Sequence, residues 1–583
     1  MAGDTGRAFG GTALRSDGSD RHTPAGAVRR EGGVTGDDGT GGPVPSPGNG
    51  AAPLGRFLVK AAAVTAGLTA AGAVLGLARD QMIAHLFGAA HDSDSFLIAW
   101  TVPEMASTLL IEDAMALLMV PAFSQALARR ASARGEDPGQ DPVRLLVGAT
   151  LPRLVLFLAA VACLLVLAAP WVVSLLAPGL PDPGLAVQCT RMTALTVLTF
   201  GVAGYLSAAL RAHRRFLPPA AIYVSYNVGI ISVMAALHTV WGVRAAAAGV
   251  AAGGLLMVLV QLPSFLCDVR AGTPRAGGVP RGRRARFRGA TPVAFGLIVP
   301  VLCFAVFRQS QVLVERFLAA SLPQGAISHL NYAQKVAQMP MVLSLMVCTV
   351  TFPAVAQAMA DGKLDRARRR VERDLVLASF AVLTGSALVI GYAPQIIAVL
   401  FERGAFTHRD TLATASVMRV YGLGLLGHCL VGALSRPFFS TARPTWFPAL
   451  AMGAGLVVNI VAGAVAVRWW GTYGIAAANA AGVSTTAALL LTGLGSRIVP
   501  VELRKIIAPV CRLAVAAAAA CAAGWAAAPL VPRPLLSAAL GCLLVPAVFV
   551  ATVAALRALE IVAPPRRVAR LVSELTVRFR HAR

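Results

Sequence analysis

Residues 143–176 read VRLLVGATLPRLVLFLAAVACLLVLAAPWVVSLL, and this stretch decides the class of protein. Arg144 and Arg153 are its only charged residues. A helix needs roughly 20 mostly apolar residues to cross the hydrocarbon core of a bilayer. The stretch therefore predicts a transmembrane helix.

Similar apolar stretches recur along the chain of 583 residues, which is 56% hydrophobic and only 14% charged, with a mean hydropathy of +0.69. Soluble domains carry about 25% charged residues, so most of this surface must face lipid or other helices. We predict an all-α integral membrane protein with about fourteen transmembrane helices. The predicted spans are residues 57–80, 93–128, 143–176, 184–212, 217–239, 243–267, 290–321, 325–360, 372–401, 410–440, 444–467, 471–496, 502–528 and 533–560.

Short matches between the two halves of the chain indicate an internal repeat. Ala169-Pro170 followed by Gly179 matches Ala393-Pro394 followed by Gly404, and Pro121–Ala128 is similar to Pro353–Ala360. The nearly constant spacing predicts two six-helix bundles in the same orientation, followed by two additional helices. Parallel repeats with a site at their interface are a transporter architecture.

The predicted domains follow from this repeat and from local composition. They are a disordered tail at 1–55, an N-terminal six-helix bundle at 56–270, a basic linker at 271–289, a C-terminal six-helix bundle at 290–498, two additional transmembrane helices at 499–561 and a basic tail at 562–583.

The formal net charge of +25 is concentrated in alternate loops. The basic loops include Arg129 and Arg130, then Arg211, Arg214 and Arg215, then 270–288, 363–373 and the C-terminal tail, whereas the loops at 177–181 and 322–325 carry no charge. Lys and Arg accumulate in cytoplasmic loops, which predicts that both termini are cytoplasmic. The charge therefore reflects membrane topology, and we expect no nucleic-acid partner.

Ionisable residues inside membrane helices are costly and mark transport pathways or binding sites. The candidates are Arg79, Asp80, Asp94, Glu112, Asp113, Arg308, Glu315, Arg316, Lys335 and Arg436. Arg308 and Glu315 are seven residues apart and so share a helix face. We predict a cavity of mixed charge between the bundles. The alternative for residues near segment ends, such as Arg79, is that the side chain extends to the membrane interface.

Motifs of enzymes and metal sites are missing from the sequence. Gly422-Leu-Gly424-Leu-Leu-Gly427 matches GxGxxG but lies in an apolar segment without a preceding strand, which favours helix packing over nucleotide binding. We therefore expect no cofactor, no metal and no catalytic residue.

Several short segments together resemble the MurJ/MviN family of lipid II flippases. They are Val74–Asp80 (VLGLARD), Leu86–Ala89 (LFGA), Asp94–Phe96 (DSF), Tyr332–Lys335 (YAQK), Leu400–Phe406 (LFERGAF) and Phe438–Ser440 (FFS). The resemblance covers residues 57–500 and identifies the chain as a divergent member of the family.

The resemblance implies a flippase that moves lipid II, the undecaprenyl-diphosphate-linked peptidoglycan precursor, to the outer leaflet by alternating access. It implies the bacterial cytoplasmic membrane as location. The implied partners are lipid II or a similar polyprenyl-diphosphate glycan, the bilayer, and cell-wall synthesis or division proteins.

The family's diphosphate-binding arginines are only partly present. Arg79 matches one arginine and Lys335 replaces another, whereas Ala73, Ser107 and Thr108 stand where the family has arginines. We expect Arg308, Arg316 and Arg436 to compensate. Release of the diphosphate or coupling to a cation is expected to involve the acidic residues Asp80, Asp94, Glu112, Asp113 and Glu315.

Two other functions remain open at this point. One is export of another polyprenyl-linked glycan or of a drug, and the other is a scaffolding role in a paralogue that no longer transports.

Overall fold

The computed structural model describes residues 51–132, 141–180, 182–270, 293–342, 344–345, 364–439, 445–497 and 502–556. Every regular element in these ranges is a helix. The helices are α1 (Ala51–Phe87), α2 (His91–Ala106), η1 (Ser107–Ala114), α3 (Met115–Ser132), α4 (Pro142–Leu176), α5 (Pro183–Ala194), α6 (Thr196–Ala212), α7 (Leu217–Trp241), α8 (Arg244–Arg270), α9 (Val293–Ala319), α10 (Ala326–Ala337), α12 (Leu364–Gly391), α13 (Ala393–Phe401), α14 (His408–Phe439), α15 (Phe447–Arg497), α16 (Leu503–Ala527), η2 (Ala528–Leu530) and α17 (Pro534–Ala555). The predicted basic linker and C-terminal tail, and the repeat segment Pro353–Ala360, lie outside the described residues.

The helix α4 shows how the apolar sequence becomes a lipid-facing surface. Its large side chains Leu164, Leu167, Trp171 and Leu175 are all exposed. They are three or four residues apart, so they form one stripe along the helix. An exposed apolar stripe marks a surface that contacts lipid or a partner, and on a helix long and apolar enough to cross a membrane it is typical of a lipid-facing side.

Ten helices of the described part of the chain are long and apolar enough to cross a membrane. One of these spans is α15, whose 51 residues would measure about 76 Å at 1.5 Å per residue, more than twice the thickness of a hydrocarbon core. The helix is interrupted at Gly471, where φ is 51° and ψ is −126°. The two parts of α15, together with α1, α9 and α10, bring these spans close to the fourteen predicted segments, and the predicted all-α membrane fold is confirmed.

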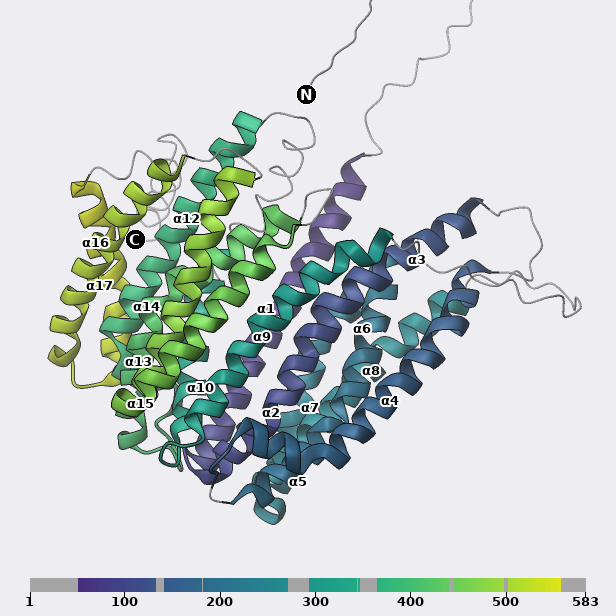
Figure 1. Ribbon diagram of the computed structural model, residues 1–583, viewed down its shortest axis with the longest axis horizontal. Helices are drawn as coiled ribbons and strands as arrows, with labels where there is room; N and C mark the ends of the chain where they lie inside the picture. The colour runs from purple at the N-terminus through teal and green to yellow at the C-terminus, as the bar shows by residue number, and fades with distance from the viewer. Residues whose placement is uncertain are drawn as a thin grey trace, which may run out of the picture. The chain divides into compact units, whose positions relative to one another are not determined.

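Figure 1 shows α2–α8 gathered on one side of the bundle and α12–α17 on the other, with α9 and α10 between them. Two glycines of the matched segments can be compared directly. Gly179 follows α4 and Gly404 follows α13, and both glycines have a left-handed φ, at +98° and +64°. Only a residue without Cβ adopts this conformation without strain.

The glycine-rich segment of α14 packs against α15. A Cβ atom at Gly424 would lie 2.8 Å from the Cβ of Ala480, and one at Gly427 would lie 3.0 Å from the Oγ of Ser484. The glycines allow the two helices to approach closely. The prediction of helix packing is confirmed.

The last helices α16 and α17 pack on the second half through Tyr392, at the end of α12. A Cβ atom at Gly524 or Gly541 would lie 3.1 Å or 2.7 Å from the ring of Tyr392. Near the start of α16, the backbone N–H of Glu502 donates to the Glu372 carboxylate at 3.1 Å. Contacts near both ends of α16 therefore hold these two helices against α12.

Candidate functional site

The helix α2 carries a local distortion that shapes the site. Pro103 has no N–H to donate to the carbonyl of Ala99, and the hydroxyl of Thr193 donates to that carbonyl instead, at 3.0 Å. The eight residues that follow α2, Ser107–Ala114, form a π-helix. Wide turns of this type occur frequently at functional sites. This one contains Thr108, Glu112 and Asp113.

A cluster of charges, which we call the central charge cluster, joins the two halves through Arg79, Asp80 and Lys335. Arg79 donates from Nε and from one terminal nitrogen to Oδ1 of Asp80, at 3.0 Å and 2.7 Å. The Nζ of Lys335 lies 3.3 Å from Oδ2 of the same carboxylate. Asp80 is thus shared by one cation from each half of the chain.

Neutral side chains hold the guanidinium of Arg79 in place. Its other terminal nitrogen donates to Oδ1 of Asn227 at 3.1 Å, and the amide of Asn227 in turn donates to the carbonyls of Gly72 and Tyr223. The guanidinium carbon lies 4.4 Å from the ring centroid of Trp100, which is within the range of a cation–π interaction. Arg79 is therefore buried and fixed, and it does not extend to the membrane interface.

Lys335 is the more accessible cation of the cluster, with 27% of its side chain exposed. Its Nζ lies 5.8 Å from the centroid of Trp100. Two cations and one carboxylate leave the cluster with a formal charge of +1. It is thus set up to attract an anion, and Lys335 is the cation that an anion can reach.

Beside the cluster, a cavity of about 290 Å³ lies between the halves. Its lining includes Glu104, Thr108, Arg308, Gln309, Gln334, Gln338 and His428. Arg308 is half-exposed there and lies 4.0 Å from Asp113 across the halves. Among the polar side chains of the lining, neutral amides and hydroxyls outnumber the charged groups.

Glu315 and Arg316 occupy a buried position behind the cavity. The amide of Asn479 donates to Oε1 of Glu315 at 2.7 Å, and that of Gln334 at 3.4 Å. Arg316 donates to the carbonyl of Ile327 at 3.2 Å. Glu315 therefore accepts hydrogen bonds from neutral donors. Arg308, seven residues earlier on the same helix, lines the cavity, whereas Glu315 is buried.

The remaining predicted site residues are spread more widely. Glu112 is exposed and accepts a hydrogen bond from the hydroxyl of Tyr223 at 2.9 Å. The side chain of Arg436 lies outside the described part of the structure.

Gln309, Gln334 and Gln338, which line the cavity, were missed because an uncharged amide in an apolar helix gives no charge signal. The sequence signal that could have predicted them is the one-turn spacing of Gln334 and Gln338, next to Lys335.

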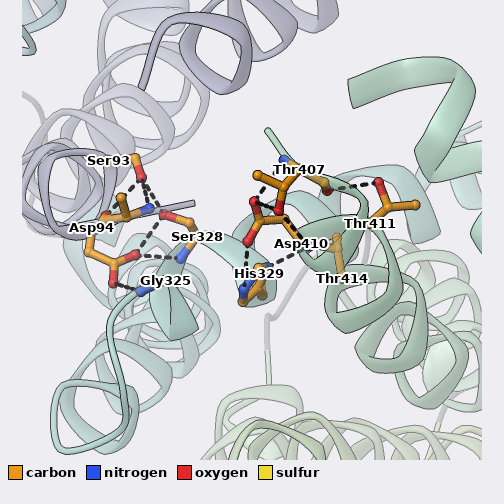
Figure 2. A network of polar contacts seen from close by, with 10 residues as sticks. Ser93, Asp94, Gly325, Ser328, His329, Thr407, Asp410, Thr411 and Thr414 are labelled. Atoms are coloured by element: carbon orange, nitrogen blue, oxygen red, sulfur yellow. Dashed lines mark hydrogen bonds and ion pairs between the residues drawn. The ribbon is translucent and has the colours of Figure 1, made fainter. Parts of the chain in front are cut away.

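Asp94 closes the bundle at the end where α2 and α10 begin. Its carboxylate accepts hydrogen bonds from the N–H of Gly325 at 2.7 Å, the N–H of Ser328 at 2.8 Å and the hydroxyl of Ser328 at 2.6 Å (Figure 2). The hydroxyl oxygens of Ser328 and Ser93 also lie 2.9 Å apart. A buried carboxylate from the first half is thus satisfied by the start of a helix from the second half.

Figure 2 shows a second set of contacts next to Asp94, within the second half. His329 hydrogen-bonds Oγ1 of Thr414 at 2.9 Å through Nδ1, and its Nε2 lies 3.8 Å from Asp410. Asp410 accepts from the N–H and the hydroxyl of Thr407 at the start of α14. This network ties the start of α10 to α14, so the two elements form one support for the Asp94 contact.

Three glycines bring the backbones of the two halves together at the same end. Gly88, Gly325 and Gly404 all have a positive φ, and a Cβ atom on any of them would lie 2.3–2.7 Å from a backbone oxygen of the opposite half. The N–H of Ala405 donates to the carbonyl of His85 at 2.8 Å. We call these glycines, with Asp94 and its donors, the closing junction.

These features define a multi-pass helical membrane transporter: two halves, a polar cavity and a central charge cluster between them, and a junction that closes one end. Residues 83–540 match the model of the family described as Lipid II flippase MurJ. The chain therefore belongs to this family, whose members are transporters and not enzymes.

Similar proteins include the Lipid II flippase MurJ of Burkholderia cenocepacia, which is 29% identical over 76% of this chain and 84% of its own length. The probable lipid II flippase MurJ of Rhizobium meliloti is 28% identical over 83% of this chain and 89% of its own length.

Among solved structures, a lipid II flippase MurJ in an inward closed conformation matches with a TM-score of 0.66 and 19% identity, over 84% of this chain and 97% of that one. An inward-facing multidrug resistance transporter of the MATE family matches with a TM-score of 0.55 and 14% identity, over 74% of this chain and 97% of that one. At these identities the two structures share the fold.

Proposed function

We propose that this chain moves lipid II from the inner to the outer leaflet of the bacterial cytoplasmic membrane by alternating access, as a step of peptidoglycan synthesis. The observation that carries the proposal is the central charge cluster, which places Arg79 and Lys335 around one shared carboxylate beside a polar cavity. Membership of the lipid II flippase family supports lipid II as the cargo.

The diphosphate is the part of the cargo that cannot cross the hydrocarbon core without a protein. A charged group crossing hydrocarbon without partners costs many kcal/mol, so it must be enclosed among compensating charges. Lys335 exchanges Asp80 for a diphosphate oxygen, and Arg308 contributes a second exposed cation on α9. Arg79 stays fixed by Asp80, Asn227 and Trp100 and sets the positive potential of the site.

In our proposal the acidic residues control release and the change of state. Once the diphosphate leaves, Asp80 forms its ion pair with Lys335 again, because an unpaired buried carboxylate is costly. Opening at the other side requires that Asp94 lose its three donors on α10. Glu315 is a candidate for coupling to a cation, because it is buried and accepts hydrogen bonds from the neutral amides of Asn479 and Gln334.

The orientation is part of the proposal. We place the arginine-rich ends of α3, α6 and α12 and both termini in the cytoplasm, following the distribution of Lys and Arg. The closing junction then faces the outside, and the cargo enters the cavity from the cytoplasmic leaflet. We also retain the predicted division into two six-helix bundles and two additional helices, and cell-wall synthesis or division proteins as partners.

Complementation tests this function. The wild-type chain should restore growth to a strain depleted of its own lipid II flippase. Charge-reversed Lys335→Glu should fail at equal expression, whereas the exposed control Asp365→Asn should rescue. Rescue by both Lys335→Glu and Arg79→Glu would rule out diphosphate binding by these residues. Failure of the well-expressed wild type would favour another cargo or a scaffolding role.

A further inference from the structure

Glu104 is a carboxylate in the cavity with one oxygen that no hydrogen bond satisfies. It lines the cavity, and its Oε2 is buried without a hydrogen-bond partner. No cation of the described residues forms an ion pair with it. The other acidic residues of the site differ: Asp80 has two cations, Asp94 has three donors, Glu315 has two amides and Asp113 has Arg308.

A carboxylate in the cavity without an ion-pair partner favours the binding of a ligand of opposite charge. Partly buried carboxylates are costly unless they are paired or hydrogen-bonded. A diphosphate cannot be the partner, because it has the same sign. A cation that enters the cavity would give this carboxylate an ion pair.

Glu104 lies one helical turn from Trp100, the aromatic ring that the two cations of the central charge cluster contact. Trp100, which contacts both Arg79 and Lys335, lies four residues before Glu104 on α2. One helical turn separates the two side chains on the same face, about 6 Å along the axis. The anion site at Lys335 and the carboxylate of Glu104 thus lie near the same ring, where one molecule that carries both charges could contact both.

We propose that Glu104 binds a primary ammonium group on the peptide of the cargo and so makes the cavity selective for precursors with a free amine. This inference rests on the proposed function. A peptidoglycan precursor carries such an amine, since cross-linking of the wall uses it as the nucleophile. The ammonium donates charge-assisted hydrogen bonds to the carboxylate, while the neighbouring neutral lining, including Gln309 and Thr108, accommodates uncharged groups.

Binding of two forms of lipid II to the purified full-length chain in liposomes tests the proposal. One form has the free amine and the other has it acetylated, which removes the charge. The wild type should bind the free-amine form about tenfold more tightly, as expected for about 1.4 kcal/mol. Glu104→Gln should bind both forms with the affinity that the wild type has for the acetylated form.

Two further variants serve as controls for this experiment. Asp92→Asn removes an exposed carboxylate from the first turn of the same helix and should keep the tenfold preference. Glu104→Asp keeps the charge on a shorter side chain and should keep part of the preference. Thermal unfolding of each variant shows whether it is folded.

Three results would overturn the inference. Equal binding of both forms by the wild type, with lipid II still transported, would refute the ammonium site and leave the proposed function intact. Loss of affinity for both forms in Glu104→Gln, with the preference kept, would show that Glu104 pairs with a cation of the chain in another state. A wild type that neither binds nor moves either form would remove the proposed function together with the inference.

Discussion

Asp80 determines how the cations of the site behave. It lies next to Arg79 in α1 and accepts two hydrogen bonds from it, and its second oxygen faces Lys335 of α10. Without this carboxylate, two cations would share one buried site. The same residue thus stabilises the empty transporter and competes with an anionic cargo for Lys335.

Replacing Asp80 with Asn should lower stability and transport together. Removing one partner of a buried ion pair costs about 3–5 kcal/mol, so the thermal unfolding temperature of the purified protein should fall clearly. The exposed Asp365→Asn is the control, with no change expected. An Asp80→Asn protein as stable as the wild type would show that the pairing with Arg79 and Lys335 contributes little.

Lys335 can be tested for anion binding without disturbing Arg79. Lys335→Gln should weaken lipid II binding about tenfold or more, because a hydrogen bond to a charged group contributes about 1.5–3 kcal/mol. Lys335→Arg should bind at least as well as wild type, since a guanidinium forms two parallel bonds to a phosphate. Binding to protein in liposomes measures both, and equal affinities in all three proteins would contradict the assigned role.

Much of the site could be predicted residue by residue, because charge inside a membrane helix is a strong signal. That signal identified Arg79, Asp80, Lys335 and Asp94. It could not predict that Asp80 bridges the halves or that Arg79 is buried over Trp100, since these contacts join residues far apart in sequence. Seven-residue spacing placed Arg308 and Glu315 on one face, but neighbouring helices decide that one lies in the cavity and the other behind it.

At the level of elements, the closing junction depends on turns and not on helices. Gly88 follows α1, Gly325 precedes α10 and Gly404 follows α13, and each has a left-handed φ. The helical type of the elements was predictable from apolar runs, but their lengths were not, since the predicted span 372–401 consists of α12 and α13. The break at Gly471 falls where the predicted spans 444–467 and 471–496 meet. The π-helix η1 was not predictable, because a single Pro in an apolar run does not fix the backbone that follows.

Substituting Gly404 should open the junction. A Cβ atom there would lie 2.3 Å from the carbonyl oxygen of His85, so Gly404→Ala must separate the halves at this end. The matched control is Gly242→Ala, which has a similar φ of +55° and no atom within 4 Å of the new Cβ. Both variants bear backbone strain of about 1–3 kcal/mol, but only Gly404→Ala also meets a clash.

Distances between spin labels on the two halves near the junction provide the readout. The Gly404→Ala population should shift to longer distances, and that of Gly242→Ala should match the wild type. Identical distance distributions in all three proteins would mean that this contact does not hold the halves together.

At the level of the whole molecule, the orientation in the membrane has a direct test. Alkaline phosphatase, which is active only outside the cytoplasm, should be active when fused after Pro178 and inactive when fused after Arg215. The expectation follows from the arginines between α6 and α7 and from the uncharged loop after α4. The reverse pattern of activity would invert the proposed topology.

Transbilayer movement of lipid II in liposomes containing the purified full-length chain tests the central claim most directly. With labelled lipid II in the inner leaflet, we predict that wild-type protein exposes the label to an external quencher well above the protein-free rate. The Lys335→Glu variant should remain near that background. Equal rates for wild type, Lys335→Glu and protein-free liposomes, with folded protein in the membrane, would contradict the account.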